Sequence, residues 1–406
     1  MAQALLIVCD GLGDLPSKNG KTPLQAAKKP NIDRLAKKGA TGLLYTISPG
    51  IIPGSDTSHL ALFGYEPEKF YPGRGPLEAL GIGIELRDGD IAFRSNFATV
   101  DKDMNIIDRR AGRIEEGADE LAKLIDGKEI DTVKIILKHS TQHRCALILR
   151  GDGLSANITD VDPHGAGKVL KSEPIDSTPE ARKTSKVLND FTKLSYDILS
   201  KAEINTRRER EGKLPANIIL SRGAGAYRRI QPFKERHGFS AACIAGGALY
   251  KGVAKYVGMD VIEVKGAIGT FNTDLSAKAK AVLEAFKTHE FVFLHIKGTD
   301  NAGHDGDFDG KVAMIEKIDA MIGDLTPKLP EGTYIILTGD HSTPISLKRH
   351  SSDPTPILIY GKNVRVDDVE KFDEISCARG SLGHLRGIEL MPIIKDKMGH
   401  AHVYGS

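Results

Sequence analysis

The chain has 406 residues, of which 40% are hydrophobic, and its 56 Lys and Arg residues nearly balance its 54 Asp and Glu residues. The formal net charge of +2 gives no electrostatic case for binding nucleic acid or a membrane surface. No apolar run approaches the roughly 18 residues needed to span a bilayer. We therefore expect no nucleic-acid or membrane partner, and the length predicts two domains.

The four cysteines are scattered and form no CxxC pattern. Free buried thiols in a reducing compartment are the expected state. The N-terminus enters an apolar segment at once, without a basic region or a cleavage site. These observations predict a cytoplasmic protein.

Residues 1 to about 82 predict alternating strands and helices. An apolar strand at 4–9 ends at Asp10, a helix starts at Pro30, and a second strand covers 42–47. Pro and Gly then punctuate the chain until a helical pattern begins at residues 56–57. Ser55 is therefore expected at or just before a helix N-terminus.

The pattern of alternating strands and helices ends at about residue 85. Short strands, a long helix from Pro179 to about Ala202 and many arginines follow. We interpret residues 85–231 as an inserted, smaller α+β domain rich in anion-binding side chains. Residues 1–84 and 232–406 form the other, discontinuous domain.

From about residue 237 the alternation of strands and helices resumes. Strands are expected at 241–244, 261–264, 291–297, 334–337 and 357–360, helices at 274–286 and 308–325, and a last helix from about Leu382. Repeated strand–helix–strand units indicate a mostly parallel sheet sandwiched by helices, so the fold class is α/β.

Three apolar strands of this domain end in acids or imidazoles. The first ends at Asp10, the second is followed by Asp300 and His304 in a Gly-containing loop, and the third by Asp340 and His341. In open α/β sheets, ligands bind beyond the carboxyl ends of the strands. Together with His384, these residues are enough for two metal ions, which clamp both oxygens of an in-line phosphoryl displacement.

Ser55 supplies the nucleophile that such a site lacks. A metal ion lowers the pKa of a bound hydroxyl, and a helix N-terminus favours the anionic phosphoserine that follows. Each residue also has an ordinary role. Ser55 is a common helix cap, His59 a core-edge histidine, and His384 a surface residue. Taken singly these ordinary roles are favoured, whereas the joint placement at strand ends favours a site.

Eight segments together resemble a known family over essentially the whole chain. They are LLIVCDGLGDLP, PGSDTSHLALFGYEP, GRGPLEALGIG, FRSNFATVD, DRRAGR, HIKGTDNAGHDGD, LTGDHSTP and SLGHLRG. The sequence resembles the cofactor-independent (2,3-bisphosphoglycerate-independent) phosphoglycerate mutases of archaeal type, within the alkaline phosphatase superfamily. The resemblance implies an alkaline-phosphatase-like fold.

The resemblance implies an isomerase of glycolysis and gluconeogenesis that interconverts 2- and 3-phosphoglycerate without 2,3-bisphosphoglycerate. It implies two divalent metal ions, with Mn²⁺ usual and Mg²⁺, Co²⁺ or Zn²⁺ as alternatives. Ser55 then becomes a phosphoserine. The ligands of one metal are Asp10, Ser55, Asp340 and His341, and those of the other are Asp300, His304 and His384.

In the insert, the resemblance implies binders for phosphate and carboxylate and a group that moves a proton between the glycerate hydroxyls. The binders are Arg109, Arg110, Arg113, His143, Arg144 and Arg222, with Lys251 outside the insert on the phosphoryl group. Asp160 or Asp162 is the expected proton shuttle. Closure of the insert at hinges near 82–88 and 225–237 is expected to exclude water.

Three alternatives remain open at this point. A phosphomonoesterase or phosphonate hydrolase of the same superfamily has the same metal ligands. A metal-dependent phosphopentomutase is a second enzymatic alternative. A metal-stabilised binding protein is the non-enzymatic alternative, although Ser55 then has no purpose beside the ligands. The oligomeric state is left open.

Overall fold

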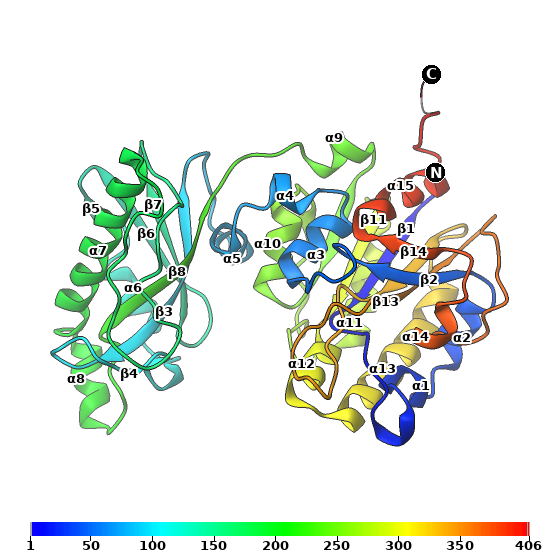
Figure 1. Ribbon diagram of the computed structural model, residues 1–406, viewed down its shortest axis with the longest axis horizontal. Coiled ribbons are helices and arrows are strands. Elements are labelled where there is room, and N and C mark those ends of the chain that lie inside the picture. The colour runs from blue at the N-terminus through cyan, green and yellow to red at the C-terminus, as the bar shows by residue number, and fades with distance from the viewer. Residues whose placement is uncertain (1, 404, 406) are drawn as a thin grey trace. The chain divides into compact units, whose positions relative to one another are not determined.

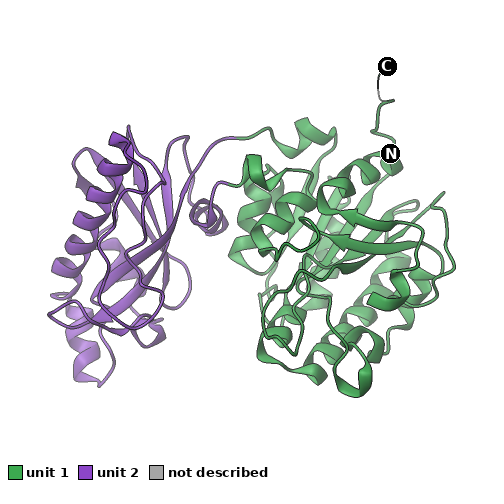
Figure 2. Ribbon diagram, viewed as in Figure 1, with its two compact units in different colours: residues 1–71, 230–406 green, residues 72–229 purple. Residues whose placement is uncertain are grey.

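The computed structural model describes residues 2–403 and 405, and these residues form two compact units (Figure 2). Unit 1 comprises residues 1–71 and 230–406, and unit 2 comprises residues 72–229. The sequence analysis placed the boundaries after residues 84 and 231. Helix α5 (Arg74–Gly81) accounts for the first difference, because its Ala79 packs with Ala92 and Ile148 of the unit 2 sheet.

Unit 1 is built on an eight-stranded sheet (Figure 1). Its strands run in the order β10-β9-β11-β1-β12-β13-β2-β14. All neighbouring strands are parallel except where β13 lies antiparallel between β12 and β2. The bounds are β1 Ala4–Cys9, β2 Ala40–Tyr45, β9 Ala241–Ile244, β10 Asp260–Val261, β11 Phe291–Ile296, β12 Tyr334–Thr338, β13 Thr355–Tyr360 and β14 Gly383–Arg386.

Helices cover both faces of this sheet. They are α1 Pro23–Ala26, α2 Pro30–Ala36, α3 Ser55–Leu62, α4 Pro67–Phe70, α9 Phe233–His237, α10 Ala248–Tyr256, α11 Leu275–Ala285, α12 Gly298–Asp305, α13 Phe308–Leu325, α14 Glu374–Cys377 and α15 Gly387–Met398. Two 3₁₀ turns lie at Lys18–Gly20 and Thr326–Lys328. The predicted α/β class is therefore confirmed.

Side-chain alternation along the central strands explains the two helical layers. Leu5 and Ile7 of β1 belong to a buried core with Ile32 of α2 and Ile315 of α13. Successive side chains of a strand point to opposite faces, so the other face of the sheet needs its own cover. On β11, Phe293 packs against the ring of His59 on α3 and that of Phe63 directly after the helix. Each fully buried aliphatic side chain of this kind contributes about 1.5–3 kcal/mol.

Unit 2 contains a six-stranded antiparallel sheet in the order β4-β3-β7-β6-β5, with β8 paired to β3. Its strands are β3 Ile91–Val100, β4 Ile106–Asp108, β5 Glu129–Ile130, β6 Val133–His139, β7 Arg144–Arg150 and β8 Ile218–Ala226. The helices besides α5 are α6 Ala118–Lys123, α7 Pro179–Leu199 and α8 Glu203–Arg210, with a 3₁₀ turn at Ala111–Arg113.

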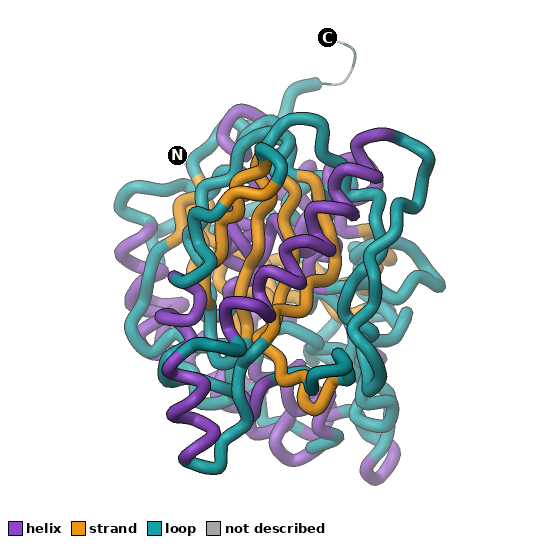
Figure 3. The backbone as a smooth tube through the Cα atoms, turned by 90° about the vertical axis from the view of Figure 1, so that its left-hand side faces the viewer, coloured by secondary structure: helices purple, strands orange, loops and turns teal. Residues whose placement is uncertain are grey.

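The long helix α7 crosses one face of this sheet (Figure 3). Its Leu188 and Phe191 are fully buried in a core shared with Phe93 and Leu147. The side chain of Thr178 caps its first turn, and Pro179 occupies the first helical position, as the sequence predicted for its start.

Two local expectations were wrong. The segment expected to start a helix at Leu382 forms β14, whose residues 383–386 pair in parallel with β2, and the helix starts at Gly387. The expected loop with Asp300 and His304 is the helix α12. Its glycines lower helix propensity, but tertiary packing overrides this preference.

Candidate metal centre

Three side chains that follow β1 and β12 meet at the carboxyl end of the unit 1 sheet. The Nε2 atom of His341 lies 3.4 Å from Oδ1 of Asp10 and 3.3 Å from Oδ2 of Asp340. All three residues are at most 2% exposed, and each offers a ligand atom within 4.8 Å of the others. Oδ1 of Asp10 and Oδ2 of Asp340 have no hydrogen-bond partner among the described residues. Two buried carboxylate oxygens without partners suit a cation.

The two carboxyl groups titrate very differently. Burial and the neighbouring Asp10 raise the pKa of Asp340 to about 8. In Asp10, burial acts to raise the pKa. The charge of Lys297 and the hydrogen bond with His295 act in the opposite direction, with a smaller effect of His341, and the pKa lies well below its usual range. The ligand atoms of Asp10 and Asp340 lie within 4.8 Å of each other, so a negative charge on one carboxylate disfavours ionisation of the other. A divalent cation between them would allow both carboxylates to ionise.

Ser55 joins this group from the first residue of α3. Its Oγ lies 3.1 Å from Nε2 of His341. His59 lies one turn later, and its Nδ1 is 2.6 Å from the backbone oxygen of Ser55. Gly54 is the residue before the helix, as the Pro and Gly punctuation predicted. The hydroxyl therefore stands at a helix N-terminus, where backbone N–H groups favour an anion.

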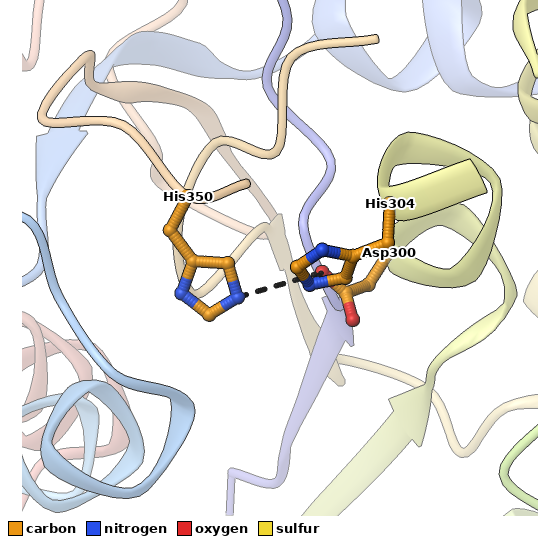
Figure 4. Close-up of side chains that lie close together, drawn as sticks. All are labelled: Asp300, His304 and His350. Atoms are coloured by element: carbon orange, nitrogen blue, oxygen red, sulfur yellow. Dashed lines mark ion pairs between the residues drawn. The ribbon is translucent and has the colours of Figure 1, made fainter. Parts of the chain in front are cut away.

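A second group lies next to the first and consists of Asp300, His304 and His350 (Figure 4). The Oδ1 atom of Asp300 is 3.4 Å from Nε2 of His304 and 3.7 Å from Nε2 of His350. Asp300 and His304 are four residues apart on α12, which places them on one helix face. The ring of His350 stacks on that of His341 with centroids 3.6 Å apart, so the two groups adjoin.

The residue that completes the second group differs from the one expected. His384, which the sequence analysis assigned here, lies on β14 beside β2 with its ring against Tyr45, and it belongs to neither group. His350 occupies the place instead, and Nδ1 of its ring is 2.9 Å from the backbone oxygen of Pro53. That contact ties the second group to the loop before Ser55.

A lysine between the two groups was also missed. The ammonium of Lys297 lies 2.7 Å from Oδ2 of Asp300 and 3.2 Å from Oδ2 of Asp10. It also donates to the hydroxyl of Tyr250 at 2.8 Å. Lys251, which the sequence analysis chose, pairs with the carboxylate of Glu263 instead. Lys297 directly follows the apolar strand β11, and this strand-end position could have identified it from the sequence.

Gly11 allows the strand-end loops to approach each other. Its φ of +59° favours glycine, and an added Cβ would meet Oδ1 of Asp300 at 2.8 Å and the side chain of Thr343 at 2.5 Å. Its N–H donates to Oδ1 of Asp340 at 3.0 Å. A larger residue here would separate the two groups.

Unit 2 contains a cationic cavity of about 280 Å³, which we call the arginine pocket. It is lined by Arg94, Asn96, Arg109, Arg110, Arg113, Gln142, His143, Arg144 and Arg222. The structure thus brings together all six insert residues predicted to bind anions. Arg94 was missed because it lies inside strand β3, whereas the sequence analysis looked for site residues at strand ends and in loops.

The arginine pocket has no acidic lining residue. Carboxylates outside the lining approach it, since Nε of Arg94 lies 3.7 Å from Glu78 and Nε of Arg222 lies 3.8 Å from Asp162, but neither distance is that of a hydrogen bond. Nε of Arg94 and of Arg222 and Nδ1 of His143 have no hydrogen-bond partner among the described residues. Burial lowers the pKa of Arg94 to about 10, so it stays charged at neutral pH. Burial together with Arg144 lowers the pKa of His143 to about 4, so this imidazole is neutral. A doubly anionic ligand would satisfy these donors.

The two aspartates expected to move a proton have different surroundings. Asp162 is fully buried and accepts two hydrogen bonds from Arg109, at 2.9 and 2.6 Å. Burial raises the pKa of Asp162, but the hydrogen bonds from Arg109 and from the N–H of His164, together with the charges of Arg109 and Arg222, lower it below its ordinary value. Asp160 is partly exposed and lies 3.0 Å from the ring of His164.

Comparisons with known proteins agree over the full chain. Residues 2–397 match the Metalloenzyme superfamily. A 2,3-bisphosphoglycerate-independent phosphoglycerate mutase from Methanocaldococcus jannaschii is 50% identical over 100% of this chain and 99% of its own length. The chain belongs to the 2,3-bisphosphoglycerate-independent phosphoglycerate mutases.

Other relatives in this mutase family are equally complete. The mutase of Methanopyrus kandleri is 46% identical over 99% of this chain and 98% of its own length. A solved cofactor-independent phosphoglycerate mutase from Thermoplasma acidophilum superimposes with a TM-score of 0.74 at 37% identity, covering 98% of this chain and 99% of that one. A solved structure from Pyrococcus horikoshii gives 0.87 at 40% identity, covering 100% and 99%.

The assignment of His350, and not His384, to the second group can be tested directly. We expect His350→Ala to weaken Mn²⁺ binding at least 100-fold, because residues that only support metal ligands already contribute about 10- to 100-fold. We expect His384→Ala to leave the affinity within about twofold. Isothermal titration of each variant with Mn²⁺ measures both values. The reverse pattern would restore His384 to the second group.

Proposed function

We infer that this chain interconverts 2- and 3-phosphoglycerate without 2,3-bisphosphoglycerate, and is therefore an isomerase. The observation that carries this inference is the family match, which extends over the whole chain and over whole relatives. A match confined to the metal-binding unit would fit any enzyme of the superfamily. Here the arginine-rich insert is matched as well.

We propose that the two side-chain groups hold two divalent metal ions. Asp10, Asp340, His341 and the hydroxyl of Ser55 would hold one, and Asp300, His304 and His350 the other. A mixed set of carboxylates and imidazoles suits Mn²⁺, with Mg²⁺, Co²⁺ and Zn²⁺ as alternatives. Bound there, such ions supply positive charge for the phosphoryl oxygens and lower the pKa of a hydroxyl.

We propose that Ser55 is the nucleophile that carries the phosphoryl group. Its Oγ lies next to the first group, and α3 directs its N-terminus toward it. The helix N-terminus and the ammonium of Lys297 would stabilise the charge of the phosphoserine. Lys297 thus takes the role that the sequence analysis gave to Lys251.

We propose that the arginine pocket binds the carboxylate and phosphate of phosphoglycerate. Arginine binds both groups bidentately, and the pocket offers five arginines besides Arg94. Holding glycerate in place makes its second reaction with phosphoserine effectively unimolecular, which is worth an effective concentration of about 10⁵ M or more. A mutase needs this retention, whereas a phosphatase does not.

An assay that follows two products decides between mutase and hydrolase. The enzyme is incubated with Mn²⁺ and 3-phosphoglycerate, without 2,3-bisphosphoglycerate. We expect 2-phosphoglycerate to form with little free phosphate. Stoichiometric release of phosphate would identify a phosphomonoesterase, and turnover of ribose 1-phosphate would identify a phosphopentomutase.

The cellular setting stays a prediction. Among residues 2–403, the structure contains no helix that combines the length and apolarity required for membrane crossing. We propose a cytoplasmic location, as expected for glycolysis and gluconeogenesis.

A further inference from the structure

Thr343 lies between the two groups of the metal centre and contacts one member of each. Its Oγ1 is 3.1 Å from Nδ1 of His341 in the first group and 2.8 Å from Oδ1 of Asp300 in the second. All three residues are at most 2% exposed, so water has almost no access to these contacts. Among residues 2–403, Nδ1 of His341 has no other hydrogen-bond partner.

The two contacts of Thr343 define which nitrogen of His341 carries the proton. A hydroxyl has one proton and an ionised carboxylate only accepts, so Oγ1 donates to Asp300. Oγ1 can then only accept from the imidazole, so Nδ1 of His341 carries the proton and Nε2 the lone pair. Nε2 is the atom that lies 3.4 Å from Asp10 and 3.3 Å from Asp340. The hydroxyl therefore leaves the lone pair on the side where a cation would bind.

The backbone of Thr343 is held by a buried lysine and by the loop after β1. Its N–H donates to the oxygen of Gly13 at 3.1 Å, and its own oxygen accepts from Nζ of Lys311 at 3.0 Å. Lys311 lies on α13, is fully buried, and pairs with Oδ2 of Asp14 at 2.8 Å. It also donates to the oxygen of Gly13 at 3.2 Å. The same ammonium thus joins the loops that follow β1 and β12.

The methyl group of Thr343 packs against the helix that carries the second group. An added Cβ at Gly303 of α12 would lie 2.8 Å from Cγ2 of Thr343 and 2.5 Å from its backbone oxygen. Only a residue without a side chain allows this close approach. A β-branched side chain has few χ1 rotamers, so a methyl group packed on one side also directs the hydroxyl on the other.

We propose that Thr343 is a positioning residue for both metal ions. Its hydroxyl keeps the proton of His341 on Nδ1, which leaves Nε2 free for one ion, and it orients Oδ1 of Asp300 toward the other. The proposal rests on the two-metal centre proposed above. Since one hydroxyl serves both groups, its loss weakens the binding of both ions, whereas loss of a direct ligand weakens chiefly one.

The test variant is Thr343→Val, which keeps the branched shape and removes the hydroxyl. We expect isothermal titration with Mn²⁺ to show both dissociation constants raised about 10- to 100-fold, and Thr343→Ser to stay within about threefold of wild type. A second measurement uses metal-free protein with ¹⁵N-labelled histidine, in which the signal absent from His341→Asn identifies the ring. We expect its proton on Nδ1 in the wild type. In Thr343→Val the proton should move to Nε2, which faces the carboxylates of the first group.

The matched control is Thr338→Val, because Thr338 is also fully buried and its hydroxyl donates to the backbone oxygen of Pro356 at 3.1 Å. We expect it to lose stability but to keep both dissociation constants and the Nδ1 proton of His341.

Three results for Thr343→Val would overturn the proposal: unchanged binding of both ions, weakening of one ion alone, or a proton that stays on Nδ1. A wild-type protein that does not bind two Mn²⁺ ions would contradict the two-metal centre and this proposal together. A protein that binds both ions but forms no 2-phosphoglycerate would contradict the mutase function alone.

Discussion

Replacing Ser55 with alanine is expected to remove mutase activity, by roughly four orders of magnitude or more, as loss of a nucleophile does in other covalent enzymes. Its Oγ, 3.1 Å from Nε2 of His341, lies beside three buried side chains that remain in the variant. We therefore expect Ser55→Ala still to bind Mn²⁺. Product formation and isothermal titration measure the two properties separately.

A suitable control for Ser55→Ala is Ser58→Ala. Ser58 lies on the same helix, is also buried, and bonds to the hydroxyl of Thr46. We expect this variant to lose stability but retain most of its kcat. Near-normal turnover by Ser55→Ala would rule out the phosphoserine route, and loss of metal binding would show that the hydroxyl matters chiefly as a ligand.

Removal of divalent metal is expected to have the second large effect. Incubation with EDTA should reduce turnover below about 1%, because neither the nucleophile nor the transferring phosphoryl group then has its positive partners. Added Mn²⁺ should restore activity. The metal should also stabilise the fold, by about 2.7 kcal/mol at a concentration 100 times its Kd. Urea unfolding with and without Mn²⁺ measures this difference.

Asp340→Asn provides the control for metal removal. The variant removes the charge of a residue whose Oδ2 atom lies 3.3 Å from Nε2 of His341. We expect EDTA and Mn²⁺ to have little further effect on its low activity. Full activity of the wild-type protein after exhaustive chelation would contradict the two-metal proposal.

The strand-end acids could be predicted from sequence because their signal is local. Apolar strands buried on both faces appear in the sequence as continuous apolar runs. Asp10 follows such a run directly, and Asp340 follows another after Gly339. The carboxyl ends of parallel strands share one edge of the sheet, so separate strand ends predict a common site. A different local signal, the Pro and Gly residues before the helical pattern at residues 56–57, placed Ser55 correctly at the start of α3.

The residues that were missed depend on tertiary packing. His350 lies in an irregular segment, and its place beside His341 is set by ring stacking and by the contact with Pro53. Neither contact leaves a periodic pattern. His384 was chosen from a shared motif, but its segment forms the edge strand β14, which pairs with β2. Arg94 points from mid-strand β3 into the pocket, and only the sheet shows this.

The strand order of unit 1 has a consequence for how the protein is made. Strand β1 lies between β11 and β12. The first strand of the chain to be synthesised can therefore pair with its neighbours only after these two late strands have been made. Unit 2 is one continuous stretch, and its final strand β8 is complete at Ala226. Since domains fold as units during synthesis, the arginines of the pocket are assembled first. The carboxylates at the strand ends of unit 1 come together only after β11 and β12 have been synthesised.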